Sequence, residues 1–143
     1  MSGFDRDKGL DDLERREGFR PCVYKDSEGL WTIGIGLLVD PSRPGAGLTH
    51  EEARWILGRR YDQKVAQLQA ALPWLKTLSD ARQRVLYDMA YQLGVSGVLA
   101  FRNTLKAVKD GDWQAAHDGM LDSKWYRQTP NRARELAEQM LNG

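Results

Sequence analysis

The feature that most restricts the fold is an apolar stripe in residues 53–72 whose members recur every three or four positions. Such intervals place side chains on one face of an α-helix, so this stretch predicts a long amphipathic helix. Thr49 and Glu52 have the spacing of a capping box, which would begin the helix, and Pro73 would end it. The stripe consists of Ala53, Leu57, Tyr61, Val65, Leu68 and Leu72.

Residues 22–39 follow a different pattern, which favours strands. Branched and aromatic residues lie on both sides of residues 26–29, whose sequence DSEG is typical of a turn. This pattern predicts a β-hairpin, with a third strand around Leu37 and Leu38. Prolines and glycines in residues 41–47 predict a loop before the long helix.

Helical patterns account for most of the remaining chain. Further helices are predicted over residues 10–18, 79–93, 97–109 and 112–121. The last helix should begin at Thr129 as N-cap, with Pro130 in its first position. One small sheet beside a majority of helices indicates an α+β fold.

Composition excludes several classes of protein. The chain has 143 residues, 41% of them hydrophobic, which suffices for a packed core. Its net charge of +1 is far from the basic balance that nucleic-acid binding requires, so no nucleic-acid partner is expected. No run is apolar enough for stable membrane insertion. The charged first 18 residues do not resemble a secretion signal, and synthesis in a reducing cytoplasm is expected.

The sequence has few residues suited to metal binding or thiol chemistry, and it predicts neither a metal site nor a reactive cysteine. With one cysteine and two histidines, no zinc constellation can be assembled, and no metal or cofactor is expected. Cys22 is predicted to be a small packed residue, because no nearby histidine could form its thiolate. The five tryptophans are predicted to be mostly core residues, with Trp125 also close to a binding cleft.

Two carboxylates occupy positions of chemical interest. Glu17 ends the first predicted helix, where the helix dipole disfavours a negative charge and so favours the protonated acid. Asp26 lies in the hairpin turn. Glycosidic bond hydrolysis needs one protonated and one ionised carboxyl group. The spacing alone leaves open whether this pair is catalytic.

The residues around this pair resemble the phage T4-type lysozymes, glycoside hydrolase family 24. The first matching block runs from Glu17-Gly18 through YKD at 24–26 and Gly29 to WTIGIG at 31–36. A second block combines QLG at 92–94, Gly97, Phe101, Asn103, Leu105, Ser123, WY at 125–126 and QTPNRA at 128–133. Two ordered blocks about sixty residues apart make the resemblance specific over most of the chain.

The resemblance implies roles for individual residues. Glu17 would be the general acid, Asp26 would activate or orient water on the opposite face of the sugar, and Thr32 would help to hold that water. The family inverts the anomeric centre, which requires carboxyl groups about 6.5–9.5 Å apart. Leu38, Tyr91 and Thr104 would contact substrate, although Tyr91 could instead be a core aromatic residue. Gln92 would help to fix two lobes, and Arg132 would pair with the catalytic Glu.

The resemblance also implies a single lysozyme domain over residues 1–143. Its small β-rich lobe would cover about 20–50, its helical lobe 1–19 and 73–143, and its connecting helix 51–72. Leu37 stands where the family usually has His, and Gly119 stands where it often has Asn. A dinucleotide-binding interpretation of GIG at 34–36 fails because neither a third glycine nor a helix follows, so close backbone approach explains these glycines better.

Together these observations predict a muramidase of the endolysin type, which cleaves the β-1,4 bond between N-acetylmuramic acid and N-acetylglucosamine in bacterial peptidoglycan. It would act as a monomer, accumulate in the host bacterial cytoplasm, and reach the wall after a separate membrane-permeabilising protein acts. A non-catalytic wall-binding protein is the first alternative, and retention of Glu17, Asp26 and Thr32 argues against it. A virion-associated enzyme is the second, and the compact chain favours the free enzyme.

Overall fold

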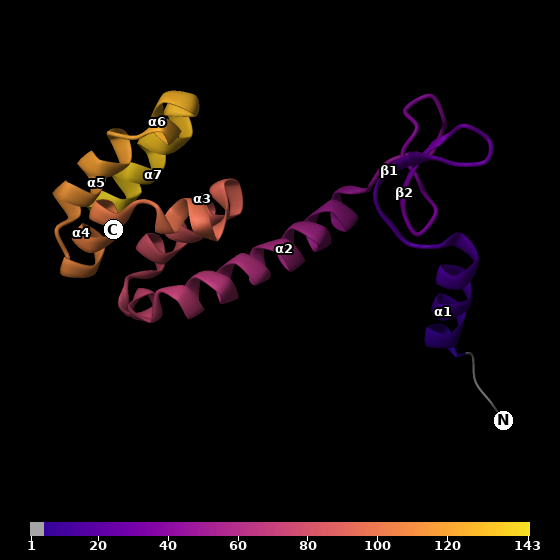
Figure 1. Cartoon of the computed structure of the whole chain (residues 1–143), viewed down its shortest axis with the longest axis horizontal. Helices are drawn as coiled ribbons and strands as arrows, with labels where there is room; N and C mark the ends of the chain where they lie inside the picture. Colours follow the sequence, from indigo (N-terminus) through magenta and orange to yellow (C-terminus); the bar gives the residue numbers. More distant parts are fainter. Residues whose placement is uncertain (1–4) are drawn as a thin grey trace. The chain divides into compact units, whose positions relative to one another are not determined.

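The computed structural model describes residues 5–143 and has the α+β architecture expected from the sequence (Figure 1). It contains one three-stranded sheet, several α-helices and a short 3-10 helix. The chain divides into two compact units, residues 1–54 and residues 55–143, and the boundary falls within α2 (His50–Ala71). The predicted grouping of residues 1–19 with 73–143 in one lobe stays a prediction, and its residues 1–4 lie outside the described part.

The first unit consists of α1 (Arg6–Glu17) and an antiparallel sheet of β1 (Arg20–Lys25), β2 (Trp31–Gly34) and β3 (Leu37–Leu38). The side chain of Asp5 caps α1 by accepting a hydrogen bond of 3.0 Å from the backbone N–H of Lys8. The strand order is β1-β2-β3, with Thr32 of β2 opposite Tyr24 on one side and Leu38 on the other. The predicted hairpin and third strand are confirmed.

This unit buries few side chains, and two predictions about burial were wrong. Thr32 is its only buried residue among residues 5–54. Cys22 is exposed on β1, since the small sheet has no second layer within its unit to cover it. Trp31 is 43% exposed, and the ammonium group of Lys25 lies 5.0 Å from its ring centroid. A cation over the ring stabilises an aromatic side chain that remains partly in water.

Helix α2 begins at the predicted capping box. The backbone N–H of Thr49 donates to the carboxylate of Glu52 at 2.7 Å, and the N–H of Glu52 donates to the hydroxyl of Thr49 at 3.1 Å. Both contacts lower the pKa of Glu52 below its usual value, and the hydrogen bond from the backbone N–H of Thr49 has a larger effect than the one with its side chain. The cap therefore strengthens as pH rises through the range in which Glu52 ionises.

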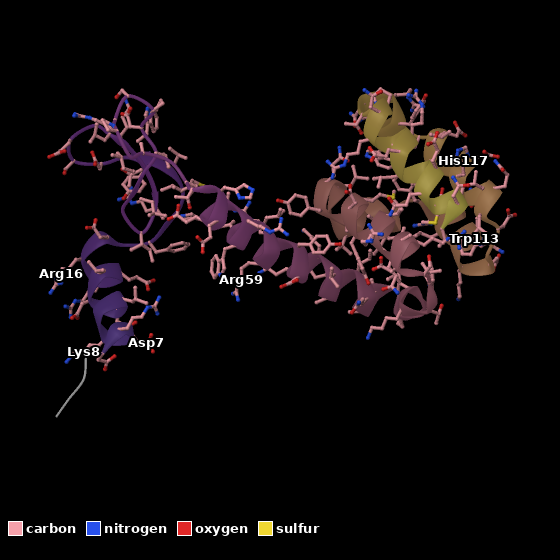
Figure 2. The ribbon with its side chains drawn as sticks, turned by 180° about the vertical axis from the view of Figure 1, so that it is seen from behind. Asp7, Lys8, Arg16, Arg59, Trp113 and His117 are labelled. Carbon is pink, nitrogen blue, oxygen red and sulfur yellow. The ribbon has the colours of Figure 1, made fainter. Side chains whose placement is uncertain are left out.

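The apolar stripe of α2 forms a core face only in its second half. Tyr61, Val65 and Leu72 pack against the core and Leu68 is fully buried, but Leu57 is 43% exposed. Trp55, also predicted as a core residue, is 67% exposed, and the guanidinium carbon of Arg59 lies 5.6 Å from its ring centroid. Figure 2 shows Arg59 on α2. Periodicity identified the helix correctly, but it carries no information on how much of the stripe another element covers.

The second unit is helical. After α2 come a 3-10 helix, η1 (Pro73–Thr77), then α3 (Asp80–Leu99), α4 (Arg102–Asp110), α5 (Trp113–Leu121), α6 (Lys124–Gln128) and α7 (Pro130–Asn142). Its core is one cluster drawn from every one of these elements and from α2. The largest fully buried side chains are Leu68, Leu75, Leu86, Met89, Met120 and Met140.

The predicted helix boundaries needed two corrections in this unit. Gly94 has φ 77° and interrupts α3 as expected, but the chain resumes helical geometry until Leu99. The helix predicted over 97–109 therefore begins only at Arg102, after the non-helical Phe101. Thr129 precedes α7 as predicted, yet its hydroxyl donates to the carbonyl of Trp125 at 3.2 Å and makes no capping bond. The short helix α6, which supplies that carbonyl, was not predicted.

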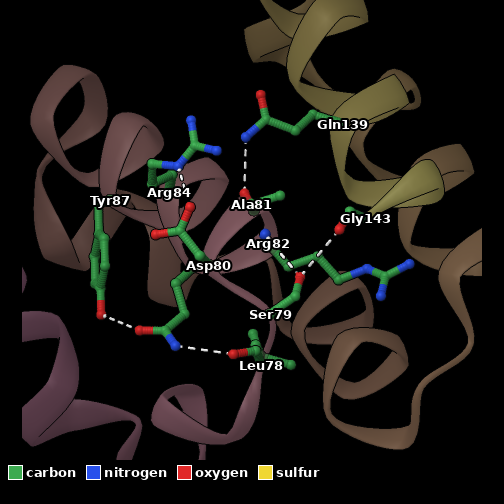
Figure 3. A network of polar contacts seen from close by, with 10 residues as sticks. Leu78, Ser79, Asp80, Ala81, Arg82, Arg84, Tyr87, Gln139 and Gly143 are labelled. Carbon is green, nitrogen blue, oxygen red and sulfur yellow. Dashed lines mark hydrogen bonds and ion pairs between the residues drawn. The ribbon is translucent and has the colours of Figure 1, made fainter.

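Arg82 ties the end of α7 to the start of α3. Its side chain donates to the carbonyls of Met140 at 2.8 Å and Leu141 at 3.1 Å, and its guanidinium carbon lies 3.7 Å from the ring centroid of Trp113. Gln139 adds a hydrogen bond of 2.8 Å to the carbonyl of Ala81 (Figure 3). A cation at helix carbonyls that lack intrahelical partners satisfies them and complements the helix dipole.

Arg82→Ala is expected to lower the free energy of unfolding by about 3 kcal/mol, because charge-assisted hydrogen bonds and a cation–π contact are lost together. Arg84→Ala is the matched control. Arg84 pairs with Asp80 at 2.8 Å on the exposed side of the same helix, and its loss should cost less than about 1 kcal/mol. Urea unfolding of both variants measures the difference, and equal losses would contradict the role assigned to Arg82.

Candidate functional site

The end of α1 sets the position of Glu17. Glu17 is the last helical residue, and Gly18 follows with φ 73° while its N–H donates to the carbonyl of Glu14 at 2.8 Å. A positive φ of this size favours glycine, so the helix stops at this point and the chain turns into β1. The predicted placement of Glu17 at a helix C-terminus is confirmed, and its side chain is exposed.

The carboxylate of Glu17 lies against the backbone of Gly36, in the connection between β2 and β3. A Cβ atom at Gly36 would lie 2.7 Å from Oε2 of Glu17 and 3.0 Å from its carboxyl carbon. Gly36 also has φ 68°. The close backbone approach inferred for this glycine therefore brings it to Glu17, although sequence spacing gave no indication of that partner.

Glu17 and Gly36 line a hollow of about 440 Å³ within the first unit. Leu10, Leu13 and Ile35 give it apolar walls, and Glu14 is its one other charged lining residue. No cation among its lining residues neutralises Glu17.

Asp26 is fixed by the β1–β2 turn. Its Oδ1 accepts hydrogen bonds of 2.9 Å from the backbone N–H groups of both Glu28 and Leu30. Its own N–H donates to the carbonyl of Leu30 at 2.9 Å. Among residues 5–143, no hydrogen bond or ion pair engages Oδ2, so one oxygen anchors the group while the other can accept a proton or a water.

Thr32 is the buried centre of the sheet. Its hydroxyl donates to the carbonyl of Leu30 at 3.1 Å, the same carbonyl that accepts from Asp26. The hydroxyl proton is thus committed to the backbone, and the lone pairs of the oxygen remain to accept a hydrogen bond from a water. Leu38 lies directly opposite Thr32 on β3, so the two share one face of the sheet.

Glu17 and Asp26 are associated with opposite ends of β2. Asp26 is bonded to Leu30, just before the strand, and Glu17 contacts Gly36, just after it. At a rise of about 3.3 Å per residue, four-residue β2 separates its two ends by about 10 Å. The first unit therefore combines two carboxyl groups in different environments, with a buried hydroxyl in the strand between them.

The second unit holds the other predicted residues. Thr104 is 6% exposed and lines a pocket of about 630 Å³ together with Gly119 and Trp125. A Cβ atom at Gly119 would collide with Oγ1 of Thr104 and lie 3.5 Å from its Cβ. Gly119 thus leaves space that the Thr104 hydroxyl occupies. Tyr91 is 38% exposed, which excludes the alternative that it is a core aromatic residue.

Gln92 and Arg132 both have partners within the second unit. The indole N–H of Trp125 donates to the side-chain oxygen of Gln92 at 2.8 Å, which ties α6 to α3. The guanidinium of Arg132 contacts Oδ1 of Asp88 at 2.6 and 2.8 Å. Asp88 was not identified from the sequence, since nothing in its local pattern points to α7. The pairing of Arg132 with Glu17 stays a prediction, as does a lobe-fixing role for Gln92.

The described part of the chain offers neither a metal site nor a membrane span. No three His, Cys, Asp or Glu side chains within residues 5–143 cluster closely enough to hold a metal ion. Over the same range, no helix has the length and hydropathy needed to cross a membrane.

Comparison with known proteins gives one family match and several relatives. Residues 14–139 match the family model described as phage lysozyme. The chain is 33% identical to the pre-baseplate central spike protein Gp5 of Enterobacteria phage T4, with 92% of this chain and 27% of that protein covered. It is also 33% identical to peptidoglycan hydrolase gp36 of Pseudomonas phage phiKMV, with 90% of this chain and 14% of that protein covered.

A third relative matches over nearly its whole length. Probable T4-type lysozyme 1 of Dictyostelium discoideum is 27% identical, with 93% of each chain covered. By contrast, this chain spans only about a quarter of the spike protein and about a seventh of the phage hydrolase. All residues discussed above from Glu17 to Arg132 lie inside the segment that the family model matches.

Proposed function

This chain belongs to the phage lysozyme family, and from that membership and the geometry around β2 we propose that it is a peptidoglycan muramidase. It hydrolyses the β-1,4 bond between N-acetylmuramic acid and N-acetylglucosamine. The observation that carries this proposal is the pair of carboxyl groups in the first unit, one beside apolar walls and one held by backbone N–H groups. A glycosidase of this kind uses one carboxyl group to protonate the leaving oxygen and a second one to activate water.

The roles follow from these environments. Glu17 protonates the bridging oxygen as the glycosidic bond breaks, and Oδ2 of Asp26 accepts a proton from the attacking water. The hydroxyl of Thr32 accepts a hydrogen bond from that water, because its own proton is already donated to Leu30. Leu38, Tyr91 and Thr104 contact the glycan strand. Water supplies the new hydroxyl at the anomeric carbon, so hydrolysis needs no other reactant.

We further propose that the anomeric configuration is inverted. A covalent glycosyl-enzyme intermediate requires carboxyl groups about 5–5.5 Å apart, whereas a wider separation leaves room for a water. The association of Glu17 and Asp26 with opposite ends of β2 supports the wider arrangement.

Analysis of the sugar ends released from purified wall tests the reaction. Mass spectrometry should find reducing N-acetylmuramic acid ends, each carrying one ¹⁸O atom when the reaction is run in labelled water. Anhydro ends would indicate a lytic transglycosylase, and reducing N-acetylglucosamine ends would indicate a glucosaminidase. Proton NMR within the first minutes should show the α-anomer, and an initial β-anomer would contradict inversion.

The contact between the Glu17 carboxylate and Gly36 gives a separate prediction. In Gly36→Ala, the new methyl group would displace the Glu17 carboxylate, so kcat should fall by about tenfold to a hundredfold while KM changes little. Gly45→Ala is the matched control, because Gly45 has φ 77° and a Cβ atom there would have no neighbouring atom within 4 Å. Equal kcat values for the two variants would contradict the positioning role of Gly36.

A release route is part of the proposal. As a free endolysin, the enzyme would accumulate as a monomer in the host cytoplasm and act on the wall once a separate protein has permeabilised the membrane. The similarity to a phage spike protein favours a second candidate, an enzyme carried in the virion. Quantitative mass spectrometry of purified virions and of the lysate separates them: stoichiometric copies in virions would support the second candidate and contradict the first.

A further inference from the structure

Trp55 on α2 is the most exposed large hydrophobic side chain within residues 5–143. It is 67% exposed, and its indole N–H has no hydrogen-bond acceptor in that part of the chain. A tryptophan side chain that packs in a core buries about 150–250 Å². Trp55 forgoes most of this stabilisation, so packing within the chain does not explain its position.

Arg59 lies over this ring from the next turn of α2. Its guanidinium carbon is 5.6 Å from the ring centroid, and Arg59 has no ion-pair partner among residues 5–143. A cation over one face of an aromatic ring holds the ring in place and leaves the opposite face free. A side chain that is already held loses less conformational entropy when it binds a ligand, so Trp55 is suited to recognition.

Gly58 lies inside α2, where glycine destabilises a helix relative to alanine. A Cβ atom at Gly58 would meet nothing within 4 Å beyond its own helical turn, so crowding among the described residues does not require glycine there. Gly58 is three positions from Trp55, and residues with this spacing are neighbours on a helix surface. The missing side chain therefore leaves the surface beside the ring open to a ligand.

The charges and the area of this surface limit what can bind to it. Asp62 is exposed, lies seven positions after Trp55 on the same face of α2, and has no ion-pair partner within residues 5–143. A polyanion would be repelled by Asp62, and a polycation would be repelled by Arg59. A stable protein interface buries about 800 Å² on each partner, several times what one tryptophan side chain supplies. The surface therefore fits a narrow, uncharged and polar ligand that has one apolar face.

A pyranose ring has these properties. One of its faces presents C–H groups that pack on an aromatic ring, and its hydroxyl groups both donate and accept hydrogen bonds. The guanidinium of Arg59 can donate to such a ligand, and the carboxylate of Asp62 can accept from it. We propose that Trp55, Gly58, Arg59 and Asp62, which we call the α2 platform, form an accessory docking site for a strand of β-1,4-linked N-acetylhexosamines.

The length of the α2 platform calls for more than one sugar ring. At a rise of about 1.5 Å per residue, Asp62 lies about 10 Å from Trp55 along the helix, so a single ring cannot contact both. This inference rests on the proposed function, because the glycan of peptidoglycan is such a strand. The α2 platform shares no residue with the hollow that contains Glu17 or with the pocket that contains Thr104. It would hold the polymer to the enzyme without taking part in bond cleavage.

NMR titration with chitotetraose, a soluble β-1,4-linked tetramer of N-acetylglucosamine, tests the inference. The indole N–H signal of Trp55 is identified by its absence from the spectrum of Trp55→Phe. In the wild-type chain this signal should shift and saturate with a millimolar Kd. Monomeric N-acetylglucosamine should bind about tenfold more weakly, because it cannot contact Trp55 and Asp62 together.

Three variants separate the α2 platform from general effects on the helix. Arg59→Gln should raise the Kd measured at the Trp55 signal by about threefold. Arg60→Gln, which removes the same charge one position later, is the matched control and should leave the Kd unchanged. Gly58→Gln should raise the Kd by about tenfold, because its side chain would fill the surface beside the ring. The same variant should raise Tm by about 2–4 °C, because glutamine favours a helix more than glycine does.

A Trp55 signal that does not respond to millimolar chitotetraose would overturn the inference. Wild-type binding by Gly58→Gln, or equal losses in Arg59→Gln and Arg60→Gln, would overturn it too. These outcomes are independent of the sugar-end analysis. An enzyme that releases N-acetylmuramic acid ends without engaging Trp55 would refute only the α2 platform. A chain whose Trp55 signal responds but that releases no such ends would refute only the proposed hydrolysis.

Discussion

Glu17→Gln should lower the rate of peptidoglycan hydrolysis by about 10³-fold while leaving the fold intact. A glutamine side chain has nearly the same shape and can rest on Gly36 as Glu17 does, but it has no carboxylic proton for the departing sugar oxygen. General acid catalysis typically contributes about 10²–10⁴-fold, so its loss should dominate kcat. Reducing-end release from purified wall measures the rate, and circular dichroism with wall sedimentation checks folding and binding.

Glu14→Gln provides a matched control for this experiment. Glu14 lines the same hollow one helical turn before Glu17, so the variant removes the same charge from the same surroundings. It should retain wild-type activity within about twofold. Wild-type activity in Glu17→Gln would show that Glu17 is not the acid. A wild-type chain that binds wall without releasing any sugar ends would instead be a non-catalytic wall-binding protein.

Asp26→Asn should lower kcat by about 10²-fold with little change in stability. The amide oxygen of asparagine can accept the two backbone hydrogen bonds that Oδ1 of Asp26 accepts from Glu28 and Leu30, so the turn persists. The variant loses the oxygen that accepts a proton from water and the negative charge opposite the developing positive charge of the sugar. Initial rates at several substrate concentrations separate kcat from KM.

Asp40→Asn is the control for Asp26→Asn. Asp40 is also a turn residue of the first unit, where its Oδ1 accepts from the backbone N–H and the hydroxyl of Ser42. Both hydrogen bonds lower the pKa of Asp40, and the one from the Ser42 hydroxyl has the larger effect. Asp40 is therefore ionised at neutral pH. Loss of its charge should not affect hydrolysis. Comparable activity losses in the two variants would show that turn charge in general, and not Asp26, is required.

Local signals in the sequence predicted the elements that carry the candidate site. Gly18, the DSEG turn and the Thr49–Glu52 capping box each act over a few residues, so the end of α1, the hairpin and the start of α2 could be located in advance. The contact between Glu17 and Gly36 joins residues 19 positions apart and depends on how α1 meets the sheet. The sequence predicted a close approach at Gly36 but did not identify Glu17 as the residue that approaches it.

Errors concentrated where burial or a distant partner decides the outcome. Leu57 follows the same periodicity as buried Leu68, yet no element covers it, and periodicity cannot distinguish the two cases. Arg82 contacts residues of α7 nearly sixty positions later, a relation that no local pattern encodes.

The anchoring of α7 has a consequence for synthesis on the ribosome. Ala133, Leu136 and Met140 complete the core of the helical unit, and Arg82 of α3 finds its carbonyl partners only in the last turn of α7. Roughly 50 residues separate the starts of these two helices, which translation at about 5–20 residues per second covers in about 3–10 s. During that interval the nascent helical unit exposes an unfinished core to chaperones and proteases, whereas the hairpin bearing Asp26 already has all its strands.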